Sequence, residues 1–145
     1  MLDNQQLYLE QYKAYLGDLG NIGSRYATVS GFYMSVISAL LGVLALAEGS
    51  KIFGQMPRSA LLVVCGFAIC LCLVWSGTIH FYRVLFKAKF KVLNALEQQL
   101  AYPCFQKEYE ELEKEKVMWL TNRERFVPLI LMGFFAAIAI VRLVA

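Results

Sequence analysis

Three apolar stretches, each long enough to cross a lipid bilayer, constrain what this chain can fold into. They cover about residues 29–47, 60–79 and 126–145. The hydrocarbon core of a bilayer is about 30 Å thick and is crossed by roughly 20 apolar residues of helix. Lipid offers no partner to free backbone groups, so each stretch is expected to be helical. The sequence therefore predicts an all-α fold: a polytopic membrane protein with three transmembrane helices and a helical cytoplasmic domain.

The composition supports the same fold class. Of the 145 residues, 59% are hydrophobic and only 17% are charged, too few to cover a water-soluble domain of this size. Three of the four cysteines, Cys65, Cys70 and Cys72, lie within the second apolar stretch, where they are expected to act as small hydrophobic residues. The cysteine spacing matches no zinc signature. We predict neither a metal site nor a cofactor.

Basic residues are distributed unequally between the two connections. Residues 48–59, between the first two stretches, contain Lys51 and Arg58, whereas residues 80–125 contain nine lysines and arginines. The positive-inside rule then places the N-terminus and residues 80–125 in the cytoplasm. Residues 48–59 form a short external loop, and the C-terminus is external.

The cytoplasmic part is predicted to consist of helices. Residues 1–28 form an amphipathic helix, and the second transmembrane helix continues past the membrane to about residue 102, before Pro103. Residues 103–125 form a charged helix. An apolar stripe runs along the continued helix at spacings of 3 or 4 and is expected to be covered by protein, as an oligomer interface. Its residues are Tyr82, Phe86, Phe90 and Leu93.

A basic stripe lies beside the apolar one on the same predicted helix, formed by His80, Arg83, Lys87 and Lys91. Such residues next to a membrane bind anionic lipid headgroups, and the acidic helix at residues 108–115 is the other expected partner. Nucleic acid is not expected, because four basic residues beside acidic neighbours do not form a broad positive surface. His80, the single histidine, is expected to mark the membrane boundary, although it titrates near neutral pH.

Small residues occupy one face of the first transmembrane helix. Gly31, Ser35, Ser38 and Gly42 recur at spacings of 4, 3 and 4. Small side chains allow two helices in lipid to approach closely, so this face predicts packing within the hairpin or between subunits. Two serines on one face also fit the lining of a water-filled path. The sequence leaves these alternatives open.

Motifs for catalysis are missing from the sequence. It contains no nucleophile elbow, no paired histidines and carboxylates at metal spacing, and no glycine-rich phosphate loop. The transmembrane stretches also lack the central carboxylates or lysines that are typical of transporters and proton relays. We therefore predict that the protein is not an enzyme and that its main partner is itself.

Residues 75–97 resemble the signature of the RipA family of octameric bacterial inner-membrane proteins. The matching residues are Trp75, Ile79, Tyr82-Arg83, Lys89-Phe90 and Leu96-Glu97, and the likeness extends to Tyr12-Lys13 and to Glu108-Tyr109. This resemblance implies a homo-octamer with a scaffold or adaptation role and without known chemistry. The architecture is also similar to that of SLATT-type membrane effectors, which makes a channel or pore-forming effector the alternative.

Overall fold

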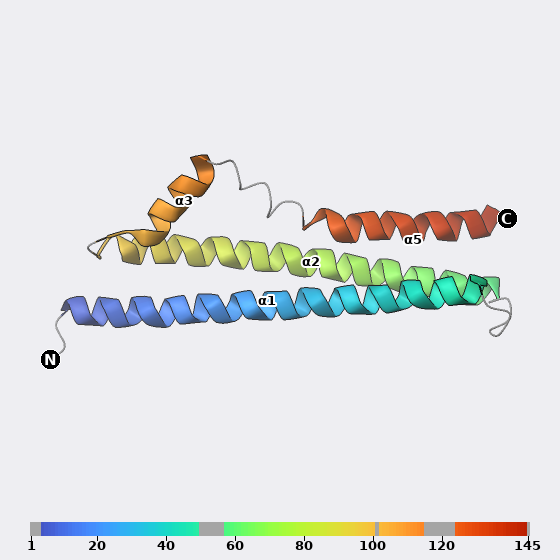
Figure 1. The fold of residues 1–145 in the computed structure, drawn as a ribbon, viewed down its shortest axis with the longest axis horizontal. Coiled ribbons are helices and arrows are strands. Elements are labelled where there is room, and N and C mark those ends of the chain that lie inside the picture. Colours follow the sequence, from blue (N-terminus) through green and yellow to red (C-terminus); the bar gives the residue numbers. More distant parts are fainter. Residues whose placement is uncertain (1–3, 50–56, 101, 115–123, 145) are drawn as a thin grey trace. The chain divides into compact units, whose positions relative to one another are not determined.

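The computed structural model describes residues 4–49, 57–100, 102–114 and 124–144. These residues form four helices and no strand (Figure 1). The helices are α1 (Asn4–Gly49), α2 (Arg58–Glu97), α3 (Cys104–Lys114) and α5 (Phe126–Val144). Helices α1, α2 and α5 are long and apolar enough to cross a membrane. The all-α prediction with three membrane-crossing helices is confirmed.

The chain divides into two compact units, and α1 and α2 contribute to both. The membrane unit comprises residues 28–79 and 124–145, which include the three apolar stretches. The juxtamembrane unit comprises residues 1–27 and 80–123. Each unit is described separately below.

The membrane unit is built from α5 and from one part each of α1 and α2. The ring of Tyr33 on α1 stacks on Trp75 of α2, with centroids 5.9 Å apart and planes 14° apart. Helix α5 packs through Phe135, which is fully buried, and the Arg58 guanidinium at the start of α2 donates to the carbonyl oxygen of Leu143 near the end of α5. This contact satisfies a carbonyl that the last turn of α5 leaves free, and it makes α5 antiparallel to α2.

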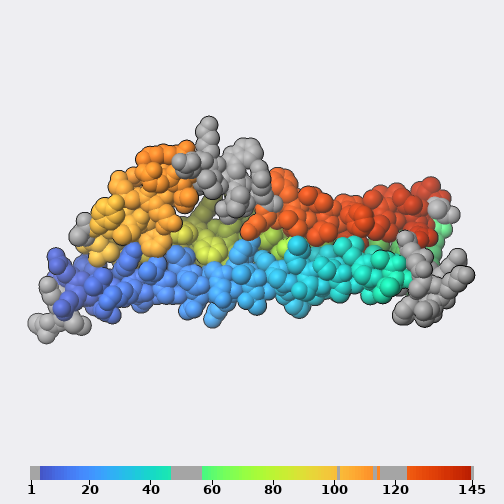
Figure 2. All heavy atoms as spheres, in the orientation of Figure 1, coloured from blue at the N-terminus to red at the C-terminus, as the bar shows by residue number. Residues whose placement is uncertain are grey.

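The juxtamembrane unit is built from the first part of α1, the last part of α2, and α3. The ring of Tyr26 on α1 contacts those of Tyr82 and Phe86 on α2, at centroid distances of 5.2 and 6.3 Å. Leu19 and Leu93 are buried. In the view of Figure 2 the orange spheres of α3 border the blue spheres of the first part of α1. The contact positions on α1 and α2 recur at spacings of 3 or 4, as in coiled-coil packing.

Two helix boundaries differ from the predicted ones. Helix α1 continues without a break from Asn4 to Gly49, so predicted segments 1–28 and 29–47 belong to one helix. Helix α2 ends at Glu97, five residues before the predicted end. The chain turns there because the N–H of Leu100 bonds to the carbonyl of Glu97 at 2.9 Å, a tighter i, i+3 contact. Pro103 immediately precedes α3, and its carbonyl accepts the first bond of that helix, from the N–H of Lys107.

Candidate functional site

A buried carboxylate joins the three helices of the juxtamembrane unit. Glu97, at the end of α2, is only 1% exposed. Its oxygens accept from the hydroxyl of Tyr12 on α1 at 2.9 Å, and from the backbone N–H groups of Phe105 and Gln106 on α3 at 3.0 and 3.2 Å. The residue that precedes α3, Pro103, has no side-chain oxygen with which to cap it. Glu97 supplies that cap, and its charge suits the positive end of the helix dipole.

The Tyr12 hydroxyl remains a donor over a wide pH range. Burial, followed by the hydrogen bond to the Glu97 carboxylate, raises the pKa of Tyr12 to about 12. At neutral pH the phenol is therefore protonated and donates to the carboxylate. A hydrogen bond to a charged acceptor contributes about 1.5–3 kcal/mol, so this contact is a main attachment between α1 and the end of α2.

Lys89 makes a second link between α1 and α2. Its side chain is only 13% exposed and forms an ion pair with Asp18. The ammonium nitrogen also lies 4.6 Å from the centroid of the Tyr15 ring, within the range of a cation–π contact. The hydrogen bond to Asp18 raises the pKa of Lys89. This lysine thus belongs to the packed side of α2, not to the basic stripe.

The predicted apolar stripe lies inside one chain. Tyr82 and Phe86 pack on Tyr26 of α1, and Leu93 is fully buried. Phe90, which is 40% exposed, contacts Phe105 of α3 at 6.3 Å between ring centroids. Helices of the same chain contact these residues, so the stripe packs within the chain, and its role as an interface between subunits stays a prediction.

The basic stripe lies mostly on the surface. His80, Lys87 and Lys91 are exposed, and Arg83 is half-buried. The predicted pairing with the acidic helix is not found for Lys87 or Lys91 among the described residues, because the ion pairs of α3 run along that helix. Their members are Lys107 with Glu110 at 2.8 Å and Lys114 with Glu111 at 2.6 Å. The stripe is therefore accessible to headgroups.

The small-residue face of α1, formed by Gly31, Ser35, Ser38 and Gly42, is exposed in the single chain. A Cβ atom added at Gly31 or Gly42 would meet no atom within 4 Å. Gly31 and Gly42 therefore face open space among the described residues, and the predicted roles of this face stay predictions. The hydroxyl of Ser35 donates to the carbonyl of Gly31 at 2.9 Å, inside its own helix.

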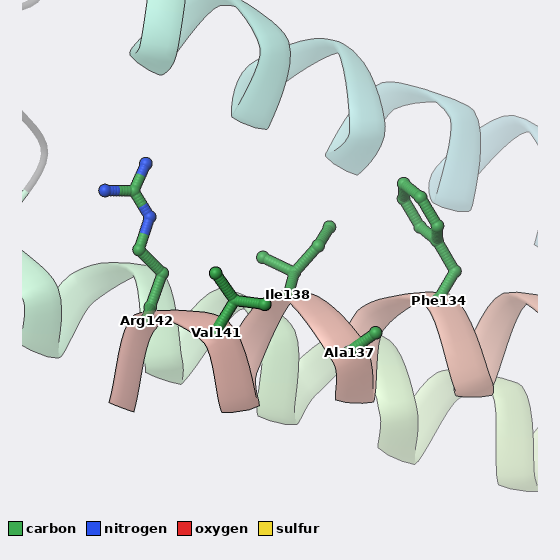
Figure 3. A pocket seen from close by; sticks show the side chains of 5 residues that line it. All are labelled: Phe134, Ala137, Ile138, Val141 and Arg142. Carbon is green, nitrogen blue, oxygen red and sulfur yellow. The ribbon is translucent and has the colours of Figure 1, made fainter. Parts of the chain in front are cut away.

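A shallow hollow of about 230 Å³ lies along α5 in the membrane unit. Figure 3 shows that Phe134 and Ile138 extend from α5 toward α1, drawn in pale blue. Apolar side chains form most of the lining, so the hollow suits hydrocarbon and offers no convergent polar groups for a reaction. Among the described residues, no group of three histidine, cysteine or acidic side chains is arranged to hold a metal ion. The lining residues are Phe134, Ala137, Ile138, Val141 and Arg142.

The site residues predicted from the sequence do not include Tyr12, Lys89 and Glu97, the residues that link the helices of the juxtamembrane unit and are called the Glu97 cluster below. In the sequence analysis, all three are named only as part of the family resemblance. A signal was present for Lys89: Tyr82, Phe86, Lys89 and Leu93 follow spacings of 4, 3 and 4, the period of one helix face. Nothing local reveals that Glu97 is buried, because its partners are up to 85 residues away.

Comparisons with known proteins agree with the membrane architecture. No curated protein and no solved structure matches the chain. Residues 9–144, nearly the whole chain, match the octameric membrane protein family. The match includes the three apolar helices and the residues of the Glu97 cluster. The chain therefore belongs to the octameric membrane protein family.

Proposed function

We propose that this integral membrane protein is a homo-oligomeric scaffold of the bacterial inner membrane, with a structural or adaptation role and without catalytic chemistry. The observation that carries the proposal is the apolar surface that one chain leaves open outside its apolar stretches. Phe81, Val84 and Val92 of the juxtamembrane unit are 62, 53 and 45% exposed. Apolar side chains on a surface of this kind favour association with protein.

Native mass spectrometry in mild detergent tests this proposal. The family description leads us to expect a particle of eight chains at dilutions at which a weak complex would dissociate. A stable monomer in every detergent and in lipid nanodiscs would contradict the proposed scaffold.

The proposed orientation places the N-terminus and residues 80–125 in the cytoplasm and the C-terminus outside. It is supported by the lysines and arginines of residues 80–125. The exposed thiol of Cys104 is a native reporter of this segment. A membrane-impermeant maleimide is expected to label Cys104 in inverted vesicles and not in intact spheroplasts, with a Cys104→Ser variant as the control. The opposite pattern would reverse the orientation.

A ring-shaped channel is the second candidate, because Ser35 and Ser38 are exposed on one face of α1. The bond from Ser35 to Gly31 favours helix packing over a wet pore, since it occupies the one hydrogen that this hydroxyl can donate. Ion flux in liposomes above that of empty vesicles, lost in a Ser35→Ala/Ser38→Ala variant, would favour the channel over the scaffold.

A further inference from the structure

A second stripe of apolar residues, the outer stripe, runs along α2 and is exposed in the described part of the chain. Phe81, Val84, Ala88, Val92 and Ala95 are exposed and recur at spacings of 3 or 4. At 100° per residue they lie roughly opposite the side of α2 that carries Tyr82, Phe86 and Leu93. Helix α2 therefore has two packing faces, and one chain uses one of them.

Lipid does not account for the whole outer stripe. Val92 lies 13 residues beyond Ile79, where the apolar stretch ends, and this is about 20 Å along the helix. The headgroup layer on one side of a bilayer adds only about 5–8 Å to the hydrocarbon core. The far end of the stripe is then in water, where a row of exposed apolar side chains is unfavourable. Protein is the expected cover.

The small-residue face of α1 also extends beyond the apolar stretch. Gly17, Gly20 and Ser24 continue the period of Gly31, Ser35, Ser38 and Gly42, and all seven are exposed. A glycine inside a helix is less favourable than alanine. Among the residues that the structure describes, nothing requires Gly17 or Gly20, since an added Cβ would meet no atom within 4 Å. The need for small residues is therefore expected to come from a helix outside this chain.

The outer stripe of α2 and the small-residue face of α1 lie at the same positions along the hairpin axis, that is, at the same height. Helices α1 and α2 pair Tyr12 with Glu97, and Tyr26 with Tyr82, so a step forward along α1 corresponds to a step back along α2. In the juxtamembrane unit this places Gly17 level with Val92, Gly20 with Ala88 and Ser24 with Val84. The pair of Tyr33 and Trp75 places Gly42 level with Phe67 and Ser35 with Val74 in the membrane unit, where Phe67 and Val74 are also exposed.

We propose that the outer stripe of α2 in one copy packs into the small-residue face of α1 in the next copy. The partner is a second copy. Rotation about the membrane normal, which relates the copies in a ring, leaves the height of each residue in the membrane unchanged, so the large side chains of α2 in one copy lie opposite the small residues of α1 in the next. The contact is heterologous, so it repeats until the ring closes, as the octameric family requires. Each α1 then lies between its own α2 and a neighbouring α2. This inference rests on the proposed homo-oligomer.

Disulfide cross-linking of the full chain in native membranes tests the contact. The background variant carries Cys70→Ser and Cys104→Ser, which removes the two exposed cysteines. In that background Gly20→Cys with Ala88→Cys is expected to give, after mild oxidation, a ladder of covalent species up to the octamer. The two positions lie on outward faces of one hairpin, too far apart for a disulfide within the chain.

The matched control is Asn21→Cys with Lys87→Cys, which lies at the same height but on other faces of α1 and α2. We expect at least tenfold less cross-linked product from this pair, and no ladder from either cysteine of the test pair alone. A control ladder of equal strength, or a dimer from Gly20→Cys alone, would overturn the proposed contact.

A second measurement separates the contact from the oligomer itself. Native mass spectrometry of the uncross-linked double-cysteine variant should show the octamer. An octamer without a ladder overturns this interface and leaves the scaffold proposal in place, whereas a stable wild-type monomer overturns both. Gly20→Leu, which one chain can accommodate, is expected to keep wild-type helix content and to lose the octamer. An intact Gly20→Leu octamer contradicts the contact.

Discussion

Removing the Glu97 carboxylate should detach α3 from the rest of the juxtamembrane unit. In a Glu97→Ala variant the N–H groups of Phe105 and Gln106 lose their acceptor, and Tyr12 loses its partner. Each of the two N–H groups of α3 loses a hydrogen bond to a charged group, which contributes about 1.5–3 kcal/mol. The docking of α3 should therefore weaken by about 3 kcal/mol. Since 1.4 kcal/mol is a factor of ten, this corresponds to roughly a hundredfold change in the docking equilibrium.

Hydrogen-exchange mass spectrometry on the protein in nanodiscs measures this change. In the Glu97→Ala variant, peptides that cover α3 should exchange up to about a hundred times faster than in the wild type, because exchange reports local opening. Peptides from the membrane unit should be unaffected. Glu111→Ala is the matched control in the same helix: its ion pair with Lys114 is exposed at both ends and is worth about 0–1 kcal/mol.

A double-mutant cycle isolates the bond between Tyr12 and Glu97. Tyr12→Phe keeps the ring and removes only the hydroxyl, and Glu97→Gln keeps an oxygen that can cap α3. We expect the effects of the two changes on α3 exchange to be non-additive by about 1–2 kcal/mol, as for groups in direct contact. Additive effects, or α3 exchange in Glu97→Ala within a factor of two of the wild type, would refute the role assigned to this carboxylate.

Three further changes test other parts of the structure. The pKa of Tyr12 is about 12 in the folded protein and near 10 in the unfolded chain, so the folded state holds the phenol proton more tightly. The free energy of unfolding should therefore be constant below about pH 9 and should fall between pH 10 and 12. Pulse proteolysis across that range should show a smaller fall in Tyr12→Phe. Lys89→Met should lower the free energy of unfolding only slightly in urea titrations, since its partner Asp18 remains 55% exposed to water. Arg83→Glu with Lys87→Glu should disturb orientation or assembly, and unchanged maleimide labelling of Cys104 and unchanged particle mass would contradict this.

The apolar stretches and the long second helix could be predicted from the sequence because both depend on local patterns. Hydrophobic length identifies a membrane helix, and the absence of a breaker before Pro103 implies a long helix after the second span. The end of α2 at Glu97 could not be predicted in this way, because a carboxylate that caps α3 and binds Tyr12 depends on a contact between residues 85 positions apart. Only folding in three dimensions brings those groups together.

For a related reason, the sequence does not show which faces meet within a chain and which meet between chains. The sequence shows which residues of α2 share a face, and Tyr82, Phe86 and Leu93 do share one. It does not show whether a helix of the same chain or of another chain covers that face, because both meet it with the same 3–4 spacing. Once α1 covers this face, the remaining exposed apolar residues of α2 become the informative ones.

The pairing of a large-residue face with a small-residue face has a consequence for how a ring can assemble. If both open faces carried large residues, two copies could associate through identical α2 stripes and stop at a dimer, whereas a face that fits only a different face must pass the contact on to the next copy. Replacing a small residue of the small-residue face with a large one should therefore prevent the ring from closing without destabilising the single chain.

Gly31→Leu tests this in the membrane unit. There an added Cβ meets no atom of the described residues within 4 Å, and leucine is the better helix former by about 1 kcal/mol. We expect this variant to keep or raise the thermal stability of its helices while the octamer gives way to smaller species in native mass spectrometry. Val43→Ala, which changes an exposed residue on another side of α1, should leave the octamer intact. An octamer that survives Gly31→Leu would mean that α1 does not lie against a neighbouring helix at this height.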